Sequence, residues 1–275
     1  MAQSIIPPNK LKHALHTGRS VVGLMLVEFR QASVMQVFAN AGFDFAIIDC
    51  EHGQFNLETI ADVSRAGRQV GVTPIVRVPD VTYAHVTQPL DAGAQGIMIP
   101  RITDAQLVID AVQMMKYPPQ GKRGSVVARG HTDLKSGPVA PAMESANEES
   151  LLIVQIETRQ ALEHLDDILS VKGVDVAFVG PTDLSVSLGV AGKMTDPGLV
   201  AAIEGVITAC SRHGVVPAVQ MNDLELAAVW AGKGMKMISY GSEVGILTAG
   251  GAHAYGVIRK SFANSEVTAE RSSSL

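Results

Sequence analysis

Eight short apolar segments recur along the chain, and each is followed by a stretch with the apolar spacing of a helix. The segments are four to eight residues long, and most are rich in Val and Ile without strict alternation. Continuous apolar runs of this length are typical of strands that are covered on both faces. In chain order the segments are 21–28, 44–49, 74–78, 95–100, 151–157, 175–180, 216–221 and 236–240.

The stretches between these segments are expected to be helices, and several of them end at a glycine in the position of a C-terminal cap. Eight strands, each followed by a helix, within about 250 residues predict a single-domain α/β fold, the (β/α)8 TIM barrel. An open doubly wound sheet is the alternative, but no G-x-G-x-x-G motif follows the first segment. The expected helices are 33–40, 57–70, 83–91, 105–115, 159–169, 197–213, 224–232 and 243–260.

Three regions depart from this repeating pattern. The barrel is expected to span 21–260, and residues 1–20 form an N-terminal extension before it. Within this extension, 9–16 has the pattern of a helix that would cover the bottom of the barrel. Residues 117–150 form a long Gly-, Pro- and Ser-rich connection, which we interpret as a functional or mobile loop. The polar segment 261–275 is predicted to be a disordered tail.

Charge and cysteine content limit the classes of partner. The chain of 275 residues carries 22 basic and 27 acidic residues, a net charge of −5, which disfavours binding to nucleic acid. Its two cysteines, Cys50 and Cys210, cannot form a disulfide framework and lack metal-site spacing, which suits a reducing cytoplasm. The apolar runs are far shorter than the roughly 20 residues of a membrane helix, and no signal peptide pattern is present. We therefore expect a cytoplasmic protein without a membrane partner.

Two carboxylates follow neighbouring predicted strands, at the barrel end where such enzymes place their chemistry. Glu157 ends the fifth segment, and Asp183 follows the sixth. Paired hard oxygen ligands without a neighbouring His or Cys suit Mg²⁺ or Mn²⁺, with water and a bidentate ligand such as a 2-oxo acid completing the octahedron. The alternative is structural: Asp183 caps a short helix and Glu157 pairs with Arg159.

Two further polar features lie near the ends of the second and third segments. Asp49 and His52 are three residues apart, and a carboxylate beside an imidazole makes a general base, whereas a structural His would cap the next helix. Glu51 and Asp91 are the next candidates for the base. Arg77 is a cation in an apolar strand, so it needs an anionic partner, either a protein carboxylate or a substrate oxyanion.

Lysine placement argues against imine chemistry, which needs a strand lysine that points into the barrel mouth. Of the ten lysines only Lys236 touches a predicted strand, and it lies at the start of that strand, the wrong end.

Several motifs, taken in order, resemble one family. They are AGFDFAIIDCEHGQFNLET, PIVRVP, LDAGAQGIMIPRI, YPPQGKRG, VQIET and FVGPTDLSVSLG. From about residue 22 to residue 250 the chain resembles the HpcH/HpaI family of metal-dependent class II pyruvate aldolases. The resemblance implies a (β/α)8 barrel and a homo-oligomer, typically a hexamer built as a trimer of dimers, in which the last helix is exchanged onto a neighbouring subunit. It also implies a carbon–carbon lyase that reversibly cleaves 4-hydroxy-2-oxo acids to pyruvate and an aldehyde.

The resemblance also assigns roles to individual residues of the catalytic machinery. Glu157 and Asp183 match the ligands of a divalent metal, Mg²⁺, Mn²⁺ or Co²⁺, with no organic cofactor. His52 matches a base that acts through a water, and Asp49 matches its dyad partner. Arg77 matches the residue that stabilises the developing enolate or alkoxide.

Further positions match by the same resemblance. Asp91 matches a carboxylate that tunes a histidine, within the chain or across a subunit boundary. The pyruvate-binding positions correspond to Gln155, Gly180, Pro181, Thr182 and Asp183. The N–H groups at the start of a helix after the GPTD motif suit a carboxylate on independent grounds.

The chain departs from the family pattern at two places that we expect to border the aldehyde side of the mouth. Glu28 and Arg30 stand at the end of the first segment, and Arg129 and His131 stand in the 117–150 connection. The sequence therefore leaves the acceptor aldehyde, the stereochemistry and the pathway undefined.

Two rival functions are weighed against this one. The first is a related barrel lyase that acts on an acyl-CoA ester or another diacid, in the manner of citrate lyase. The net charge of −5 and the 4% aromatic content disfavour the basic, adenine-accepting rim that a CoA enzyme needs. The second is a non-catalytic barrel, which the joint presence of Glu157, Asp183, His52 and Arg77 disfavours.

Overall fold

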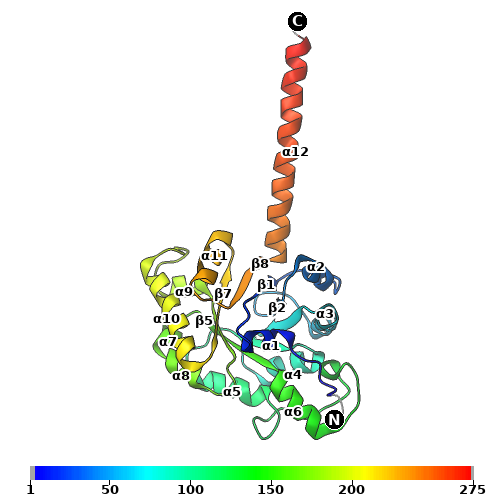
Figure 1. Ribbon diagram of the computed structural model, residues 1–275, viewed down its shortest axis with the longest axis vertical. Helices are drawn as coiled ribbons and strands as arrows, with labels where there is room; N and C mark the ends of the chain where they lie inside the picture. Colours follow the sequence, from blue (N-terminus) through cyan, green and yellow to red (C-terminus); the bar gives the residue numbers. More distant parts are fainter. Residues whose placement is uncertain (1–3, 274–275) are drawn as a thin grey trace.

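The computed structural model describes the backbone of residues 4–273 and the side chains up to residue 262. Eight parallel strands close into a barrel in the order β1 to β8, with β8 paired to β1 (Figure 1). This confirms the predicted (β/α)8 barrel. The strands are β1 (Val21–Leu26), β2 (Phe45–Asp49), β3 (Thr73–Arg77), β4 (Gly96–Ile99), β5 (Leu151–Ile156), β6 (Val176–Val179), β7 (Val216–Met221) and β8 (Met237–Ser242).

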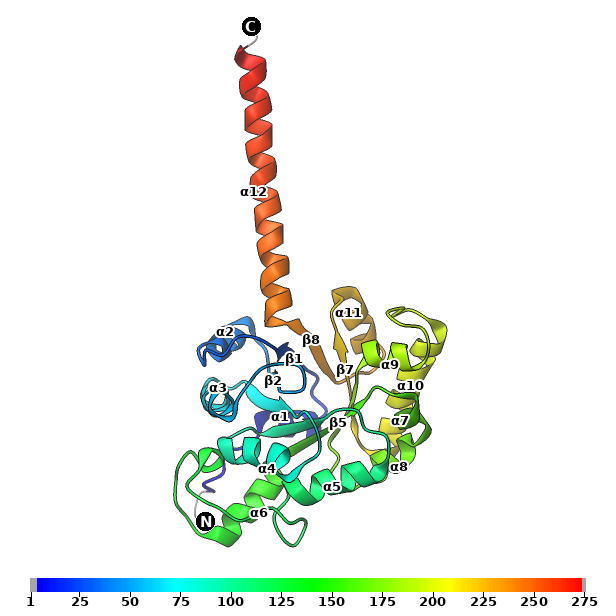
Figure 2. The ribbon, with the colours of Figure 1, turned by 180° about the vertical axis from the view of Figure 1, so that it is seen from behind.

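Helices surround the barrel on its outside (Figure 2). The predicted 159–169 helix is divided in two at His164. The helices are α1 (Lys10–His16), α2 (Val34–Ala41), α3 (Leu57–Val70), α4 (Tyr83–Ala92), α5 (Ala105–Met115), α6 (Val139–Glu149), α7 (Arg159–Glu163), α8 (Leu165–Ser170), α9 (Pro181–Ser187), α10 (Pro197–His213), α11 (Leu224–Gly232) and α12 (Glu243–Ser273).

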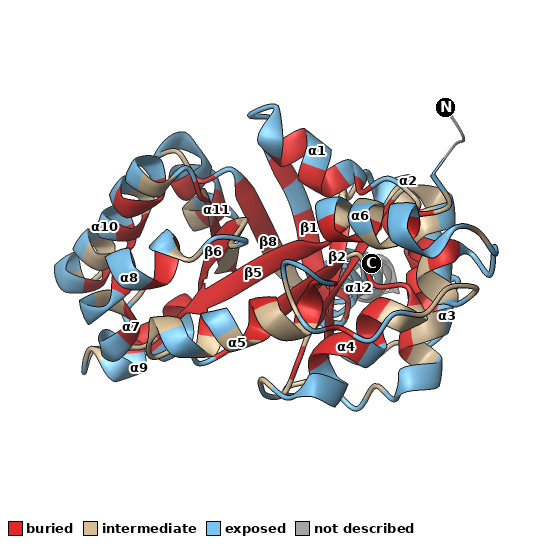
Figure 3. Ribbon diagram, turned by 90° about the horizontal axis from the view of Figure 1, so that it is seen from below, coloured by how far each residue is buried: buried red, intermediate tan, exposed pale blue. Residues whose placement is uncertain are grey.

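The strands are mostly apolar because both of their faces are largely buried. In β2, Ile47 belongs to the cluster inside the barrel, while Ile48 belongs to the cluster between strands and helices. Figure 3 shows the strands as almost continuously buried ribbons. Since successive side chains of a strand point to opposite faces, this assignment also fixes which later residues point inward.

The helix expected near residues 9–16 is present as α1, which closes the bottom of the barrel. The Asn9 side chain caps it by accepting from the Lys12 N–H at 3.0 Å and donates to the Gln95 carbonyl at 2.9 Å. Leu11 and Leu15 pack into the cluster inside the barrel. Lys12 Nζ lies 3.1 Å from Asp175 Oδ1, which anchors the helix to the start of β6.

The 117–150 connection is not the loop that its composition suggests. It contains α6 and a short 3-10 turn at Gly130–Thr132, and within one chain it lies under the barrel. Arg68 on α3 donates to the Gly130 carbonyl at 2.8 Å, and Glu149 accepts from the Asn9 N–H at 2.5 Å.

The expectation that Arg129 and His131 border the mouth is therefore wrong within one chain. The physical reason is connectivity, because α5 has already returned the chain to the bottom, where β5 must begin.

The last helix, α12, projects far from the barrel (Figures 1 and 2). Its 31 residues correspond to roughly 46 Å at 1.5 Å per residue. It continues to Ser273, so the backbone of 261–273 is helical where the polar composition predicted a frayed tail. No glycine or proline interrupts this segment, so nothing in the backbone stops the helix. Within residues 4–273 no helix is long and apolar enough to cross a membrane.

Candidate active site

Strand periodicity carries polar side chains into the barrel above its apolar interior. Ile47, Ile75 and Ile153 lie in the interior cluster, and two residues beyond each of them stand Asp49, Arg77 and Gln155. Together with the loops that follow the strands, these positions line a cavity of about 250 Å³. The described residues that line it are Met25, Val27, Asp49, His52, Arg77, Met98, Gln155, Phe178, Gly180, Pro181, Thr182, Asp183, Gln220, Asn222, Gly241 and Ser242.

Glu157 is a buried carboxylate at the end of β5, with 3% of its surface exposed. The Arg101 N–H donates to its Oε1 at 2.6 Å, and Gln155 Nε2 donates to Oε2. The pKa of Glu157 is raised from 4.5 to about 7, chiefly by burial and further by the charges of Glu51 and Asp183, while the Arg101 hydrogen bond and the charge of Arg77 act in the opposite direction. A cation bound beside Glu157 would therefore stabilise its ionised form.

Asp183 stands in the first turn of α9 and lines the cavity. The structural roles considered for the two carboxylates are not observed. The N-cap of α9 is Gly180, without a side-chain capping bond, and within residues 4–262 no ion pair joins Glu157 to Arg159. Neither carboxylate is therefore engaged in the structural role considered for it; Asp183 lines the cavity, and Glu157 is buried two residues beyond the lining residue Gln155.

The residues around Glu157 fit a small hard cation. A Cβ built on Gly180 would lie 2.8 Å from Glu157 Oε2 and 2.9 Å from Gln155 Nε2, so only glycine leaves this space open. Gln155 Oε1 is buried without a hydrogen-bond partner. Across the described part of the chain no group of three or more His, Cys, Asp and Glu side chains has metal-site geometry. A metal here would take two carboxylates from the protein and its remaining ligands from water or substrate.

The anionic partners of Arg77 are protein carboxylates. Arg77 is the register partner of Asp49, and its Nε and Nη2 donate to Asp49 Oδ1 and Oδ2 at 2.9 and 2.6 Å. Its Nη1 lies 3.2 Å from Glu51 Oε2. Burial alone lowers the pKa of Arg77, but the Asp49 hydrogen bond and the charges of Asp49, Glu51 and Glu157 outweigh it and raise the pKa. Arg77 is a permanent, oriented cation at the cavity wall.

The predicted side-chain pair of Asp49 and His52 is not formed within the described residues. Asp49 Oδ1 accepts from the backbone N–H groups of Glu51 and His52 at 3.0 and 3.3 Å, and Arg77 donates to both carboxylate oxygens of Asp49. The His52 imidazole is 72% exposed, with Nε2 at 3.9 Å from Glu51 Oε2. The β2–β3 register pairs Asp49 with Arg77, and His52, in the loop after β2, lines the cavity with its ring exposed to solvent.

Glu51 and Arg101 also belong to the site. From the sequence, Glu51 is only the next candidate for the base after His52, and Arg101 has no assigned role. Glu51 lies between Arg77 and the Arg101 Nε, which is 3.2 Å from Glu51 Oε1. Arg101 has a φ of 52°, in the left-handed region, which is uncommon outside glycine and here directs its N–H toward Glu157. No sequence signal marks that backbone conformation. The D-x-E-H spacing is the signal that could have placed Glu51.

Asp91 is not part of the mouth in one chain. It lies on α4 near the bottom of the barrel, where its carboxylate pairs with Arg123 Nη2 at 2.5 Å. A role for Asp91 at a neighbouring subunit stays a prediction.

The cavity offers neither an amine nor a thiolate nucleophile among its described lining residues. No lysine lines it. Burial raises the pKa of the adjacent Cys50 thiol to about 12, so the thiol stays protonated at neutral pH. Arginine, imidazole, carboxylate and amide groups therefore carry the chemistry.

Comparisons with known proteins agree with this arrangement. The family model described as HpcH/HpaI aldolase/citrate lyase matches residues 23–249. A hydroxypyruvate/pyruvate aldolase of Agrobacterium fabrum is 35% identical over 252 residues, which are 88% of this chain and 93% of that protein. A 4-hydroxy-2-oxo-heptane-1,7-dioate aldolase of Salmonella arizonae is 34% identical over 244 residues, covering 88% and 91%.

A solved structure extends the likeness to three dimensions. The HpcH/HpaI aldolase from Desulfitobacterium hafniense superposes with a TM-score of 0.87 at 35% identity, covering 90% of this chain and 96% of that one. Fold, site chemistry and relatives point to one enzyme class, that of the carbon–carbon lyases. The chain belongs to the HpcH/HpaI aldolase/citrate lyase family and is an aldolase.

Proposed function

We propose that the protein is a divalent-metal-dependent aldolase that reversibly cleaves 4-hydroxy-2-oxo acids to pyruvate and an aldehyde. The observation that carries the proposal is the buried Glu157 carboxylate, which forms no ion pair within residues 4–262 and whose pKa is raised by burial and by the nearby charge of Asp183. The Agrobacterium and Salmonella relatives, which are named as aldolases of 2-oxo acids, support a 2-oxo acid substrate.

Glu157 and Asp183 would hold Mg²⁺ or Mn²⁺, which supplies Lewis-acid chemistry to the oxygens of a 2-oxo acid. Gln155 and the first N–H groups of α9 would orient the substrate carboxylate. Arg77 would stabilise negative charge that develops on oxygen during cleavage. His52 would take the proton from the 4-hydroxyl, directly or through a water, because its ring lies at the rim with access to solvent.

The family also includes citrate lyase, so a second substrate class has to be compared with the 2-oxo acids. An acyl-CoA ester or a diacid would use the same two carboxylates. The described lining of the cavity contains Phe178 as its single aromatic residue and Arg77 as its single arginine or lysine. That composition favours a compact 2-oxo acid over a large nucleotide-bearing thioester.

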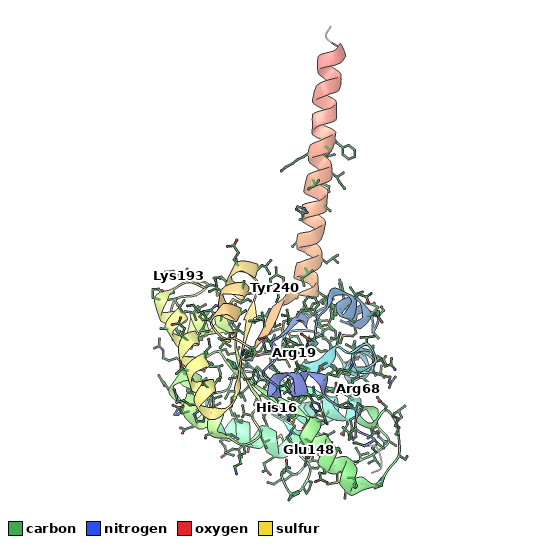
Figure 4. The ribbon with its side chains drawn as sticks, in the orientation of Figure 1. His16, Arg19, Arg68, Glu148, Lys193 and Tyr240 are labelled. Atoms are coloured by element: carbon green, nitrogen blue, oxygen red, sulfur yellow. The ribbon has the colours of Figure 1, made fainter. Side chains whose placement is uncertain are left out.

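The enzyme is proposed to act in the cytoplasm as a homo-oligomer, a hexamer assembled as a trimer of dimers. Support comes from α12, which beyond its base at β8 carries its described side chains clear of the barrel (Figure 4). Apolar residues along its described part are exposed, and an isolated helix would leave them in water. They are Val244, Ile246, Leu247, Tyr255, Val257, Ile258 and Phe262.

The test uses the purified full-length protein and a panel of 4-hydroxy-2-oxo acids, with citrate and an acyl-CoA ester as further arms. We expect pyruvate release that requires Mg²⁺, Mn²⁺ or Co²⁺ and stops in EDTA. Borohydride added with pyruvate should leave the enzyme active, since the described cavity lining has no lysine. Full activity in EDTA, or turnover of the thioester alone, would contradict the proposal.

A further inference from the structure

The chain just beyond β1 is held by one carboxylate, that of Glu243. The Val27 N–H donates to both carboxylate oxygens of Glu243 at 3.0 Å, the Glu28 N–H donates to Oε1 at 2.6 Å, and the Phe29 N–H donates to Oε1 at 3.0 Å. These N–H groups follow the last residue of the strand, so they have no ladder partner of their own. Three consecutive N–H groups thus converge on a side chain 214 to 216 residues away in the sequence.

Glu243 is the first residue of α12 and is 5% exposed. Within residues 4–262, no Lys, Arg or His forms an ion pair with it. Its charge is therefore balanced by backbone dipoles, in the way that successive N–H groups hold an anion. A buried carboxylate held by three donors fixes its partners closely, because a small displacement would leave donors and charge unsatisfied.

The segment that Glu243 holds forms part of the cavity wall. Val27 lines the cavity, and so does Ser242, the residue directly before Glu243. In the closed order of strands, β1 lies four strands from β5, and Glu157 directly follows β5. Val27 and Ser242 therefore border the half of the mouth that is remote from Glu157. The aldehyde part of a substrate would extend into this half, which we call the acceptor half.

We propose that Glu243 is a positioning residue that fixes segment 27–29 as the wall of the acceptor half, and thereby sets which aldehydes are accepted. The inference rests on the proposed aldolase function and goes beyond it. Among the described residues Glu243 forms no hydrogen bond or ion pair with Glu157, Asp183 or Arg77, so it acts through Val27. The exposed Glu28 and Arg30 side chains leave the barrel from this held segment or next to it, and their placement at the rim depends on the same contact.

The test compares Glu243→Gln, which replaces one acceptor oxygen with a donor, with Glu243→Asp, which keeps the charge but shortens its reach. Glu225→Gln is the matched control, because Glu225 is an exposed first-turn acid of the neighbouring α11. Three readouts are taken on the Mg²⁺-loaded enzyme. They are amide hydrogen exchange at 27–29, exchange of pyruvate methyl protons in heavy water, and aldol addition of pyruvate to acetaldehyde, propanal and succinic semialdehyde.

In Glu243→Gln we expect faster amide exchange at 27–29 and pyruvate proton exchange within about twofold of the wild-type rate. The kcat/KM for the aldehydes should fall about 10- to 100-fold, chiefly through KM and unequally among the three. Glu243→Asp should lie between Glu243→Gln and the wild type, and Glu225→Gln should match the wild type. The proposal would be overturned by unchanged amide exchange at 27–29 or by an unchanged aldehyde preference. An equal loss of pyruvate proton exchange and of aldol addition would also overturn it.

The two proposals fail differently. If the wild type catalyses neither proton exchange nor addition, the aldolase function fails and the acceptor role of Glu243 fails with it. If the wild type is active and the variants keep its aldehyde preference, the function stands and only the role of Glu243 is lost.

Discussion

Arg77 and Asp49 form a bidentate pair between neighbouring strands, with donor–acceptor distances of 2.9 and 2.6 Å. The pair follows from the β2–β3 register, which sets the two residues side by side on the interior face. Because Glu51 also approaches Arg77, one guanidinium orients two carboxylates at the cavity wall.

The first prediction concerns Arg77. Arg77→Lys should lower kcat/KM for a 4-hydroxy-2-oxo acid about 100- to 1000-fold, because a lysine lacks the planar fork that stabilises charge on oxygen. Arg77→Ala should lower the free energy of unfolding by about 3 kcal/mol, since it leaves Asp49 buried without its partner. Steady-state kinetics and urea unfolding measure the two effects.

A double-mutant cycle tests the stability part of this prediction. Arg77→Ala combined with Asp49→Ala should be less destabilised than the sum of the single variants, because no unpaired charge remains. Strict additivity would mean that the pair is not coupled in solution.

The second prediction is that Glu157 is a metal ligand. Glu157→Gln should lower the affinity for Mn²⁺ and abolish most of the activity. The protein should stay folded, since Glu157 lies outside the apolar clusters. Calorimetric titration with Mn²⁺ and circular dichroism measure the two properties. Glu163→Gln, an exposed glutamate of α7 in the same β/α unit, is the control and should behave as the wild type. Wild-type metal dependence in Glu157→Gln would remove the ligand assignment.

The third prediction concerns the stability of the metal-free protein as a function of pH. The pKa of Glu157 rises from 4.5 to about 7 on folding, so between these values the folded state binds more protons than the unfolded state. The free energy of unfolding should therefore fall as pH increases from about 4.5 to 7, by about 3 kcal/mol at most, and then level off.

Urea unfolding in EDTA at pH 5 and pH 8 measures this fall. Glu157→Gln should lack the part of this fall that comes from Glu157. Mg²⁺ or Mn²⁺ added at pH 8 should restore the lost stability in the wild type but not in the variant. An identical pH dependence in wild type and variant would show that Glu157 does not titrate in this range.

The fourth prediction concerns His52. His52→Ala should slow cleavage by about 100- to 10,000-fold, the usual contribution of a general base, while Mn²⁺ affinity stays close to the wild-type value. Pyruvate methyl exchange followed by NMR should slow as well. His164→Ala serves as control, because His164 is also an exposed histidine. Cleavage at the wild-type rate in His52→Ala would move the base to Glu51, which lies between Arg77 and Arg101.

The fifth prediction concerns α12. Placing charge on its exposed apolar side chains, as in Ile258→Glu combined with Phe262→Glu, should shift the protein to smaller species in analytical ultracentrifugation. Val37→Glu, at an exposed position of α2, should leave the sedimentation of the wild type unchanged. An unaltered assembly in the α12 variant would show that this helix face is not an interface.

Several elements of the site could be predicted because they depend on local order along the chain. The period of two in β2, β3 and β5 is sufficient to bring Asp49, Arg77 and Gln155 to the interior face above the apolar layer. The partner of Arg77 could not be chosen in this way. That choice depends on the β2–β3 register, and spacing alone left both a protein carboxylate and a substrate oxyanion open.

The sequence by itself determined the barrel, the approximate positions of its strands and the strand-end residues Asp49, Arg77 and Gln155 that line the cavity. These properties follow from apolar runs, helix spacing and chain direction, which are local. Only the tertiary structure decided that Asp49 binds Arg77 instead of the His52 ring, and that the left-handed Arg101 directs its N–H to Glu157. Tertiary structure likewise decided that Glu243 holds residues 27–29 and that 117–150 lies under the barrel. Each of these arrangements joins groups distant in sequence or depends on a backbone conformation that no residue pattern marks.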